Sequence, residues 1–292
     1  MAENSSIEWC DHTINTHWGC VKVNEGCDNC YAESLSKRFD KGKSLWGKNS
    51  SRRIVKSAFN DLAKFQKKAQ KLNQIYRVFI GSMMDIFEKP MPMIDEKGNV
   101  VSHPIMDGKD PLNELAYSTG DLRSFLFSEI ENGSYPNLMF LFLTKRPSNI
   151  NKYIPQKWKT NPPKNVMFGL SIVNQETADK LMPDFLEVRG FKFLSIEPQL
   201  DEIDLLKRPL SKDPKSAFKY EFYRYLDCIN WVIQGGESGH NKRPFNLDWA
   251  YSMKRQCEIA NVPYFFKQID KIKPIPEDLK IREFPIFENL NS

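Results

Sequence analysis

The chain reads Leu138-Met139-Phe140-Leu141-Phe142-Leu143, an unbroken apolar run, directly before the polar pair Thr144-Lys145. A run of this length and composition is typical of a strand that is buried on both faces of a parallel sheet. Five further runs of similar composition also end in small or polar residues. They occupy residues 76–80, 166–170, 191–196, 229–233 and 263–266. A weaker pattern over residues 11–16 is compatible with one more strand.

Segments with helical patterns lie between the apolar runs. They occupy residues 32–39, 51–72, 112–131, 175–188 and 246–260. Strands that alternate with helices at this spacing predict βαβ units and a parallel sheet. About seven such units within 292 residues predict one α/β domain over residues 1–292, a partial or complete (β/α) barrel with parallel strands. A doubly wound open sheet is the alternative.

Three segments do not follow the repeating pattern. Residues 88–110 are proline-containing and without period, which predicts a long loop over the mouth of the barrel. Residues 207–225 are rich in basic and aromatic side chains and are expected to form a surface excursion. The C-terminal extension from about residue 270 is rich in proline and charge, and we expect it to wrap around the outside.

Composition excludes some classes of protein. Because no apolar run reaches the roughly 18 residues that a membrane span requires, the sequence predicts no transmembrane helix and no membrane partner. The first residues have no basic region followed by an apolar stretch, so we expect a cytoplasmic protein. The net charge of +5 permits a nucleic-acid partner without requiring one.

Cys20, Cys27 and Cys30 form the tightest cysteine cluster, with the spacing C-x6-C-x2-C. Because thiols stay reduced inside cells, this spacing indicates a metal site rather than disulfides. Three thiolates on a [4Fe–4S] cluster leave one iron open for a substrate or a second cofactor. On zinc, His12 or His17 would supply the fourth ligand.

Polar residues stand at the ends of the predicted strands. In a parallel barrel the loops after the strands meet at one face, where the chemistry is located. We therefore expect these residues to converge on one mouth: Ser82, Asp85, Thr144, Lys145, Arg146, Ser171, Asn174, Glu197, Glu237, Lys267 and Gln268. For Glu197, a salt bridge with Lys145, Arg146 or Lys267 is as compatible with the sequence as a catalytic role.

Cations and aromatic residues are also found at this predicted mouth. The cations Lys145, Arg146, Arg243 and Lys267 suit phosphate or carboxylate groups. The aromatic residues Trp18, Tyr31, Trp46 and Phe87 could stack a base, and a flipped nucleotide could enter. A basic rim that neutralises nearby Asp and Glu is the plainer interpretation. Met83 and Met84 are expected to pack in the core or against a cofactor.

Several ordered motifs carry a family resemblance. They are Ile7-Glu8-Trp9, Gly19-Cys20 through Cys30-Tyr31-Ala32-Glu33, Gly81-Ser82-Met83-Met84-Asp85, Leu143-Thr144-Lys145-Arg146-Pro147, Gly169-Leu170-Ser171-Ile172-Val173-Asn174-Gln175, Leu194-Ser195-Ile196-Glu197-Pro198, Gly235-Gly236-Glu237-Ser238-Gly239 with Arg243-Pro244, and Phe265-Phe266-Lys267-Gln268. Together they resemble the phage-type three-cysteine-motif proteins, a radical SAM-like domain of unknown function. The chain departs from the usual C-x3-C-x2-C spacing of radical SAM enzymes, and Asn29 stands where an aromatic residue usually precedes the third cysteine.

The resemblance implies a [4Fe–4S] cluster on Cys20, Cys27 and Cys30, and S-adenosylmethionine as the second cofactor. On this interpretation one set of residues binds the cofactor: Ser82 and Asp85 at its amine, Ser171 and Asn174 at its ribose or carboxylate, and Gly235 and Gly236 in a tight turn toward its adenine side. A second set contacts the substrate: Arg146, Arg243, Lys267 and Gln268. A third set would be catalytic: Glu197, Glu237 and Lys145.

The resemblance implies a radical SAM-type enzyme that acts on nucleic acid or a nucleotide, in repair or modification, in a phage or mobile-element context. It is similar in style to spore photoproduct lyase, and it requires an external electron donor. A separate three-cysteine-motif protein is an expected partner. Two alternatives stay open: a non-catalytic zinc module that binds nucleic acid or protein, and a radical SAM enzyme that acts on a peptide or on the partner protein.

Overall fold

The computed structural model describes residues 5–39, 44–101, 117–207, 223–239 and 241–286. Its main element is a sheet of seven parallel strands whose spatial order follows the chain, β1-β4-β6-β7-β8-β9-β10. The strands are β1 (His12–Ile14), β4 (Tyr76–Ile80), β6 (Leu138–Thr144), β7 (Val166–Ser171), β8 (Phe191–Ile196), β9 (Trp231–Gly235) and β10 (Tyr264–Gln268). The predicted strands are thus confirmed, with ends that differ by up to two residues.

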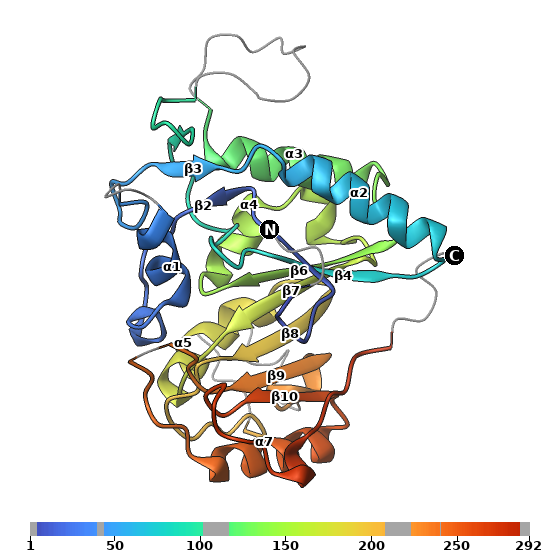
Figure 1. Cartoon of the computed structure of the whole chain (residues 1–292). Coiled ribbons are helices and arrows are strands. Elements are labelled where there is room, and N and C mark those ends of the chain that lie inside the picture. Colours follow the sequence, from blue (N-terminus) through green and yellow to red (C-terminus); the bar gives the residue numbers. More distant parts are fainter. Residues whose placement is uncertain (1–4, 40–43, 102–116, 208–222, 240, 287–292) are drawn as a thin grey trace.

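The sheet curls into a half-barrel (Figure 1). Because the strand order never reverses and parallel crossovers share one hand, the crossover helices all lie on the same, outer face. The partial barrel is therefore confirmed, and the alternative of a doubly wound open sheet is wrong. One core cluster lies between the outer face and its helices, and a second, smaller cluster lies inside the curl.

Side chains of the strands alternate between these two clusters. In β6, Leu138, Phe140 and Phe142 belong to the outer cluster, whereas Met139 and Leu141 belong to the inner one. This period of two, within a run that is apolar on both faces, is what a strand covered on both sides requires. The inner cluster fills only the lower part of the curl, so residues farther along each strand are left to line a space above it.

Trp9 closes the lower part of the half-barrel from inside. Its ring lies 4.6 Å from that of Phe79, 6.2 Å from that of Phe193 and 6.3 Å from that of Trp231. The segment after β10 comes back to the same place, because Phe284 packs against Trp231 at 5.6 Å and Glu283 accepts a hydrogen bond from the Trp231 indole. The expectation that the C-terminal extension stays on the outside is therefore wrong for this part of it.

The helices on the outer face begin where the sequence supplies a cap. They are α2 (Ala58–Lys71), α3 (Thr119–Glu131), α4 (Ile150–Tyr153), α5 (Gln175–Leu186) and α7 (Leu247–Ala260). Asn174 and Asn246 accept backbone N–H bonds at the starts of α5 and α7, and Ser118 forms a capping box with Asp121 at the start of α3. The predicted helix over 112–131 is shorter in the described residues, because Ser118 ends the extended chain and begins α3.

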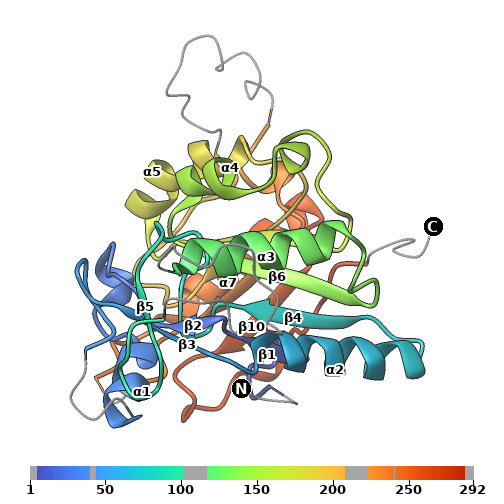
Figure 2. The ribbon, with the colours of Figure 1, turned by 90° about the horizontal axis from the view of Figure 1, so that it is seen from above.

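A second, three-stranded sheet stands beside the half-barrel. It contains β2 (His17–Trp18), β3 (Arg52–Ile54) and β5 (Met93–Ile94), and α1 (Tyr31–Phe39) lies next to it in both views (Figure 1 and Figure 2). One prediction is wrong here: residues 51–72 do not form one helix, because their first part is β3. The predicted long loop over residues 88–110 contains the two-residue strand β5. Residues 102–110 and 208–222 lie outside the described part of the chain.

Short 3-10 helices complete the described chain at Glu25–Cys27, Pro147–Asn149, Gln156–Lys159, Leu226–Cys228 and Glu277–Leu279. In the part of the chain that the structure describes, no helix combines the length and the apolar character needed to traverse a bilayer.

Gly169 leaves room inside the half-barrel for the ring of Phe193 on the next strand. A Cβ atom at residue 169 would lie 2.2 Å from that ring. We expect Gly169→Ala to lower the free energy of unfolding by about 1–3 kcal/mol, measured by urea denaturation, because the packed core cannot expand. Gly239→Ala is the control, since the nearest atom to its Cβ is 3.9 Å away. Gly169→Ala/Phe193→Leu should recover part of the loss, and a Gly169→Ala protein as stable as wild type would contradict this packing.

Candidate functional site

A cavity of about 600 Å³ opens at the C-terminal ends of the parallel strands, above the inner cluster. Its position follows from the alternation of side chains. Ser171 lies two residues after Gly169, Ser195 two after Phe193, and Lys267 two after Phe265, so each continues the inward face of its strand. The volume is within the range of small-molecule and cofactor sites. The cavity is therefore the candidate site.

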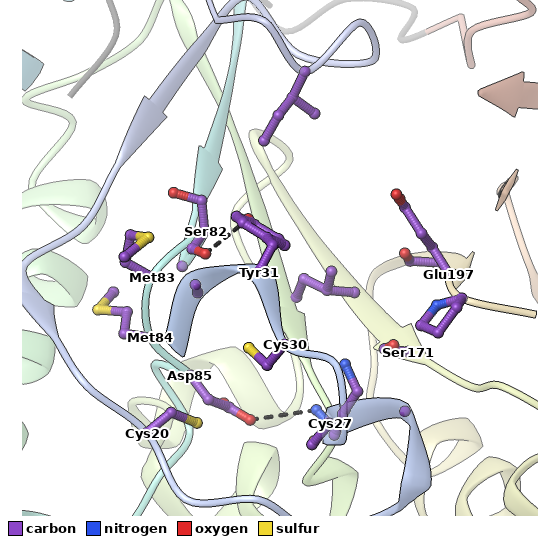
Figure 3. Close-up of a pocket in the computed structure, with 18 of the residues that line it drawn as sticks. Cys20, Cys27, Cys30, Tyr31, Ser82, Met83, Met84, Asp85, Ser171 and Glu197 are labelled. Atoms are coloured by element: carbon purple, nitrogen blue, oxygen red, sulfur yellow. Dashed lines mark hydrogen bonds between the residues drawn. The ribbon is translucent and has the colours of Figure 1, made fainter. Parts of the chain in front are cut away.

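Most of the residues predicted to meet at one mouth line this cavity. They are Ser82, Asp85, Thr144, Lys145, Arg146, Ser171, Glu197, Gly236, Glu237 and Lys267, with Cys20, Cys27 and Cys30. Figure 3 shows Cys20, Cys27 and Cys30 around one part of the cavity, with Asp85 between Cys20 and Cys27 and with Glu197 and Ser171 to one side. Asn174, Gly235, Arg243 and Gln268 are not among the lining residues.

The cysteine loop, residues 20–30, runs from β2 to α1. Asn24 caps the short helix Glu25–Cys27 by accepting the N–H of Gly26. Gly26 rests on the half-barrel, because a Cβ there would lie 2.5 Å from a methyl carbon of Val173. The loop is thus seated on the β7–α5 connection, and this contact brings its thiols to the cavity.

All three thiols of the loop are free of disulfides. The Cys20 Sγ lies 3.9 Å from both terminal nitrogens of Arg146, and the Cys27 Sγ lies 3.8 Å from the side-chain oxygen of Asn24. Burial raises the pKa of Cys20 to about 12, with a further contribution from Asp85 that Arg146 partly offsets. No three His, Cys, Asp or Glu side chains of the described chain form a group that could hold a metal ion.

Asp85 and Arg146 form a charged pair next to Cys20. Arg146 donates to Asp85 at 2.5 Å and to the Val21 carbonyl at 2.7 Å, so it ties the cysteine loop to the end of β4. The Asp85 carboxylate also accepts the Thr144 hydroxyl at 2.8 Å and the backbone N–H groups of Phe87 and Lys145. Although burial acts to lower the pKa of Arg146, Asp85 raises it, so the guanidinium stays charged.

Ser82 lies between the cysteine loop and β1. Its hydroxyl accepts a bond from the Asn15 amide at 2.8 Å, which leaves its O–H free to donate. Its carbonyl accepts the Tyr31 hydroxyl at 2.8 Å. Asn15 also accepts the N–H of Met83 at 2.7 Å, so the turn after β4 is fixed in place.

Ser171 and Ser195 are register partners on β7 and β8, and both line the cavity. The Ser171 hydroxyl is buried and has no hydrogen-bond partner within the part of the chain that the structure describes. A buried hydroxyl without a partner indicates a position where a ligand or water completes the bonding. Ser171 was expected at the mouth from the sequence. Ser195, Thr13 and Asn15 also line the cavity but were not among the predicted site residues.

Glu197 and Lys267 form an ion pair in the wall of the cavity. The register shift in β10 between Phe266 and Gln268 makes Lys267 the extra residue of a β-bulge, and it lines the cavity. The Glu197–Pro198 peptide bond is cis. Of the partners considered for Glu197, the structure therefore selects Lys267.

Glu237 is held by Arg243 and Asn29. Arg243 donates to it from its guanidinium and its backbone N–H, and Asn29 donates at 3.0 Å. Burial acts to raise the pKa of Glu237, but the bonds from Arg243 outweigh it and lower the pKa. Arg243 also donates to the carbonyl of Glu25, so this group connects the β9 loop to the cysteine loop.

The remaining predicted site residues have structural partners. Asn174 caps α5 and contacts Glu25, and Gln268 donates to the Gly236 carbonyl at 2.9 Å. Gly235 packs against Gln268, since a Cβ there would lie 3.3 Å from its carbonyl oxygen.

Aromatic side chains form much of the remaining lining. Trp18, Tyr31 and Trp46 line the cavity, as do Met83 and Met84. The expectation that Phe87 also lines it is wrong, because Phe87 is fully buried in the outer cluster against Phe127 and Phe142. The lining therefore combines aromatic faces with cations at one opening.

Neither histidine proposed as a zinc ligand lines the cavity. The ring of His12 stacks on Phe65 at 3.9 Å, on the outer face. His17 is buried beside Thr16, and burial lowers its pKa to about 3, so its imidazole is neutral. As the described chain is arranged, a zinc ion on the three thiols would have no imidazole from either residue.

The comparisons with known proteins give one match. The family model described as "Protein of unknown function (DUF5131)" matches residues 4–102 and 123–280. Neither the curated proteins nor the solved structures give a match for this chain. Because the family match covers most of the sequence, the chain belongs to the DUF5131 family.

Proposed function

We propose that this chain is a radical SAM-type enzyme that acts on nucleic acid or a nucleotide. The observation that carries the proposal is that Cys20, Cys27 and Cys30 line one cavity at the C-terminal ends of the strands of a parallel half-barrel. In this architecture the chemistry belongs at that face. The three thiols are free of disulfides, and once the loop draws them together they would supply three ligands of an iron–sulfur cluster and leave one iron open.

The donor set fits a [4Fe–4S] cluster better than zinc. Thiolate sulfur suits both, but a structural zinc site completes its tetrahedron with a fourth protein ligand, and the two candidate histidines lie away from the cavity. Binding requires the thiols to lose their protons and the loop to draw them together. The guanidinium of Arg146, 3.9 Å from the Cys20 Sγ, favours the thiolate form.

S-adenosylmethionine would lie in the cavity beside the cysteine loop. When bound, the reduced cluster supplies the electron that cleaves this cofactor to methionine and a 5′-deoxyadenosyl radical. The free O–H of Ser82 and the unpartnered hydroxyl of Ser171 offer hydrogen bonds to its polar groups. Asp85 already accepts several bonds, so we assign it to holding Arg146 and the cysteine loop rather than to binding the cofactor amine.

The rest of the lining favours a nucleotide as substrate. Lys145 lines the cavity without an ion pair in the described residues, whereas Arg146 and Lys267 are paired with Asp85 and Glu197. Trp18, Tyr31 and Trp46 offer surfaces on which a base can stack. Of the predicted catalytic residues, Glu197 is paired with Lys267, which was predicted to contact the substrate, and a substrate can reach both side chains from the cavity. Glu237 is bound by Arg243 and Asn29 and holds the loops together, so its proposed role is positional.

The test is reductive cleavage of S-adenosylmethionine by the anaerobically reconstituted full chain. We expect about four iron atoms per chain, an absorption band near about 400 nm, and 5′-deoxyadenosine formed with dithionite as the electron donor. Stoichiometric zinc without iron would instead support the zinc module. An iron-loaded protein that forms no 5′-deoxyadenosine would overturn the enzymatic proposal. If a peptide or a partner protein, rather than an oligonucleotide, stimulates the cleavage, the assigned substrate class is wrong.

A further inference from the structure

A second cavity of about 350 Å³ adjoins the first one, and we name it the basic groove. It is lined by Lys267, Lys271, Lys273 and Arg282, with one carboxylate, Glu8. Ser6, Lys267 and Lys271 line both cavities, so the two cavities share a wall. Four cations against one carboxylate give the groove an excess of positive charge.

Two of the cations are free to bind a ligand. Lys271 and Lys273 are exposed, and neither side chain forms a hydrogen bond or ion pair with the chain within the described residues. Lys267 and Arg282 have partners already, in Glu197 and Glu8. The unpaired positive charge of the groove is therefore concentrated on the turn after β10.

This turn is held in place by the carboxylate of Asp270. Asp270 accepts the N–H groups of Ile272 at 3.0 Å and Lys273 at 2.7 Å, and it pairs with Lys242 at 3.2 Å. The bond from the backbone of Lys273 lowers the pKa of Asp270 to about 2, so the carboxylate stays ionised at neutral pH. Asp270 forms its ion pair with Lys242, and in the part of the chain that the structure describes it forms none with Lys271 or Lys273.

We propose that the basic groove binds the phosphodiester backbone of a nucleic-acid strand whose target nucleotide occupies the large cavity. This deepens the proposed function and rests on it in taking that cavity as the reaction chamber. A nucleic acid is favoured over an acidic peptide because the adjoining cavity presents Trp18, Tyr31 and Trp46 for stacking. The shared wall at Lys267 and Lys271 places phosphate binding directly beside the nucleotide.

The test measures how binding of a fluorescein-labelled, mixed-sequence 12-nucleotide DNA strand depends on salt. If Lys271 and Lys273 each contact a phosphate, Lys271→Gln/Lys273→Gln lowers the slope of log K against log salt by about 1.4. Loss of these two contacts should make binding of the strand roughly 25-fold weaker at 0.1 M salt. The matched control is Lys67→Gln/Lys71→Gln, which removes two exposed lysines of α2 on the outer face and should change neither value.

The proposal that the basic groove binds the strand would be overturned by an unchanged salt slope in the Lys271→Gln/Lys273→Gln protein. Equally weakened DNA binding in the α2 control would overturn it as well. So would a polyglutamate peptide that binds wild type as tightly as the oligonucleotide does. Wild-type protein that forms 5′-deoxyadenosine but binds no oligonucleotide would refute nucleic-acid binding by the groove and would leave the enzymatic proposal standing. Wild-type protein that binds the strand through these lysines but takes up no iron refutes the enzymatic proposal and leaves the groove standing.

Discussion

Cys27→Ala is expected to abolish iron binding. After anaerobic reconstitution, wild type should hold about four iron atoms and the variant close to none, with loss of the absorption near about 400 nm. The reason is that each of the three thiols must ligate a different iron of one cluster, and the fourth position is left for the cofactor. Cys20→Ala and Cys30→Ala should behave in the same way. Iron content and absorption are measured without any assay of turnover.

Cys228→Ala is the matched control for these three variants. Cys228 lies at the end of the short helix Leu226–Cys228, and it does not line the cavity. Its replacement should leave the iron content at the wild-type level. Wild-type iron content in the Cys27→Ala protein would show that the cysteine loop is not the cluster site. An equal loss of iron in the Cys228→Ala protein would show the same. Urea denaturation of each variant shows whether a loss of iron simply reflects unfolding.

The position of the cysteine loop explains why small changes near it should also matter. Gly26 seats the loop on Val173, and Arg146 ties the carbonyl of Val21 to Asp85. Each contact joins the loop to a different strand end, so the three thiols are placed by the half-barrel and not by the loop alone. The sequence shows the spacing of the cysteines, but these supports are long-range contacts that spacing does not reveal.

The strands of the half-barrel were predictable because burial on both faces leaves a mainly apolar run, which is unbroken over Leu138–Leu143 in β6. The small sheet was not, because β2 and β5 are two residues long and β3 is three. Such short strands carry no period of their own. Residues 51–54 therefore carry no signal that separates them from the helix that follows, although Arg52 is fully buried in β3.

The candidate site was predictable only in part, and the errors have a common cause. Residues just after each strand were expected at the mouth. Successive side chains of a strand point to opposite faces, however, so only every second residue faces the cavity. Ser195 faces the cavity because it continues the inward face of Phe193, and counting in steps of two would have found it. Asn174 and Gln268 do not line the large cavity: Asn174 caps α5, and Gln268 donates to the Gly236 carbonyl and lines the basic groove instead.

Arg52→Met is expected to cause the largest loss of stability in the described chain. Arg52 is fully buried, and its five N–H groups all have acceptors. It donates to both oxygens of Glu88, at 2.9 and 2.8 Å. It also donates to the carbonyls of Leu45, Gly47 and Ser50, at 2.9, 3.2 and 2.7 Å. One side chain thus ties β3 and residues 45–50 to the loop after β4.

Most of the expected loss in the free energy of unfolding of Arg52→Met comes from Glu88, which stays buried without Arg52. Glu88 is buried with 3% exposure, so its carboxylate would lose its bidentate partner without gaining water and would keep only Arg146, whose terminal nitrogen lies 4.0 Å away. Breaking one side of a buried ion pair costs about 3–5 kcal/mol. At about 2–4 °C per kcal/mol for a chain of this size, the melting temperature should fall by roughly 6–20 °C. The loop that carries Trp46 to the cavity would lose its anchor at the same time.

Two further variants separate the charge from the packing. Arg52→Met/Glu88→Met removes the buried carboxylate that has lost Arg52 and should be more stable than Arg52→Met alone, because an apolar pair can replace a buried ion pair at little cost. Lys280→Met breaks the exposed pair with Glu277 and should change the free energy of unfolding by no more than about 0.5 kcal/mol. An Arg52→Met protein that unfolds at the wild-type urea concentration would show that the Arg52–Glu88 pair does not hold the small sheet to the half-barrel.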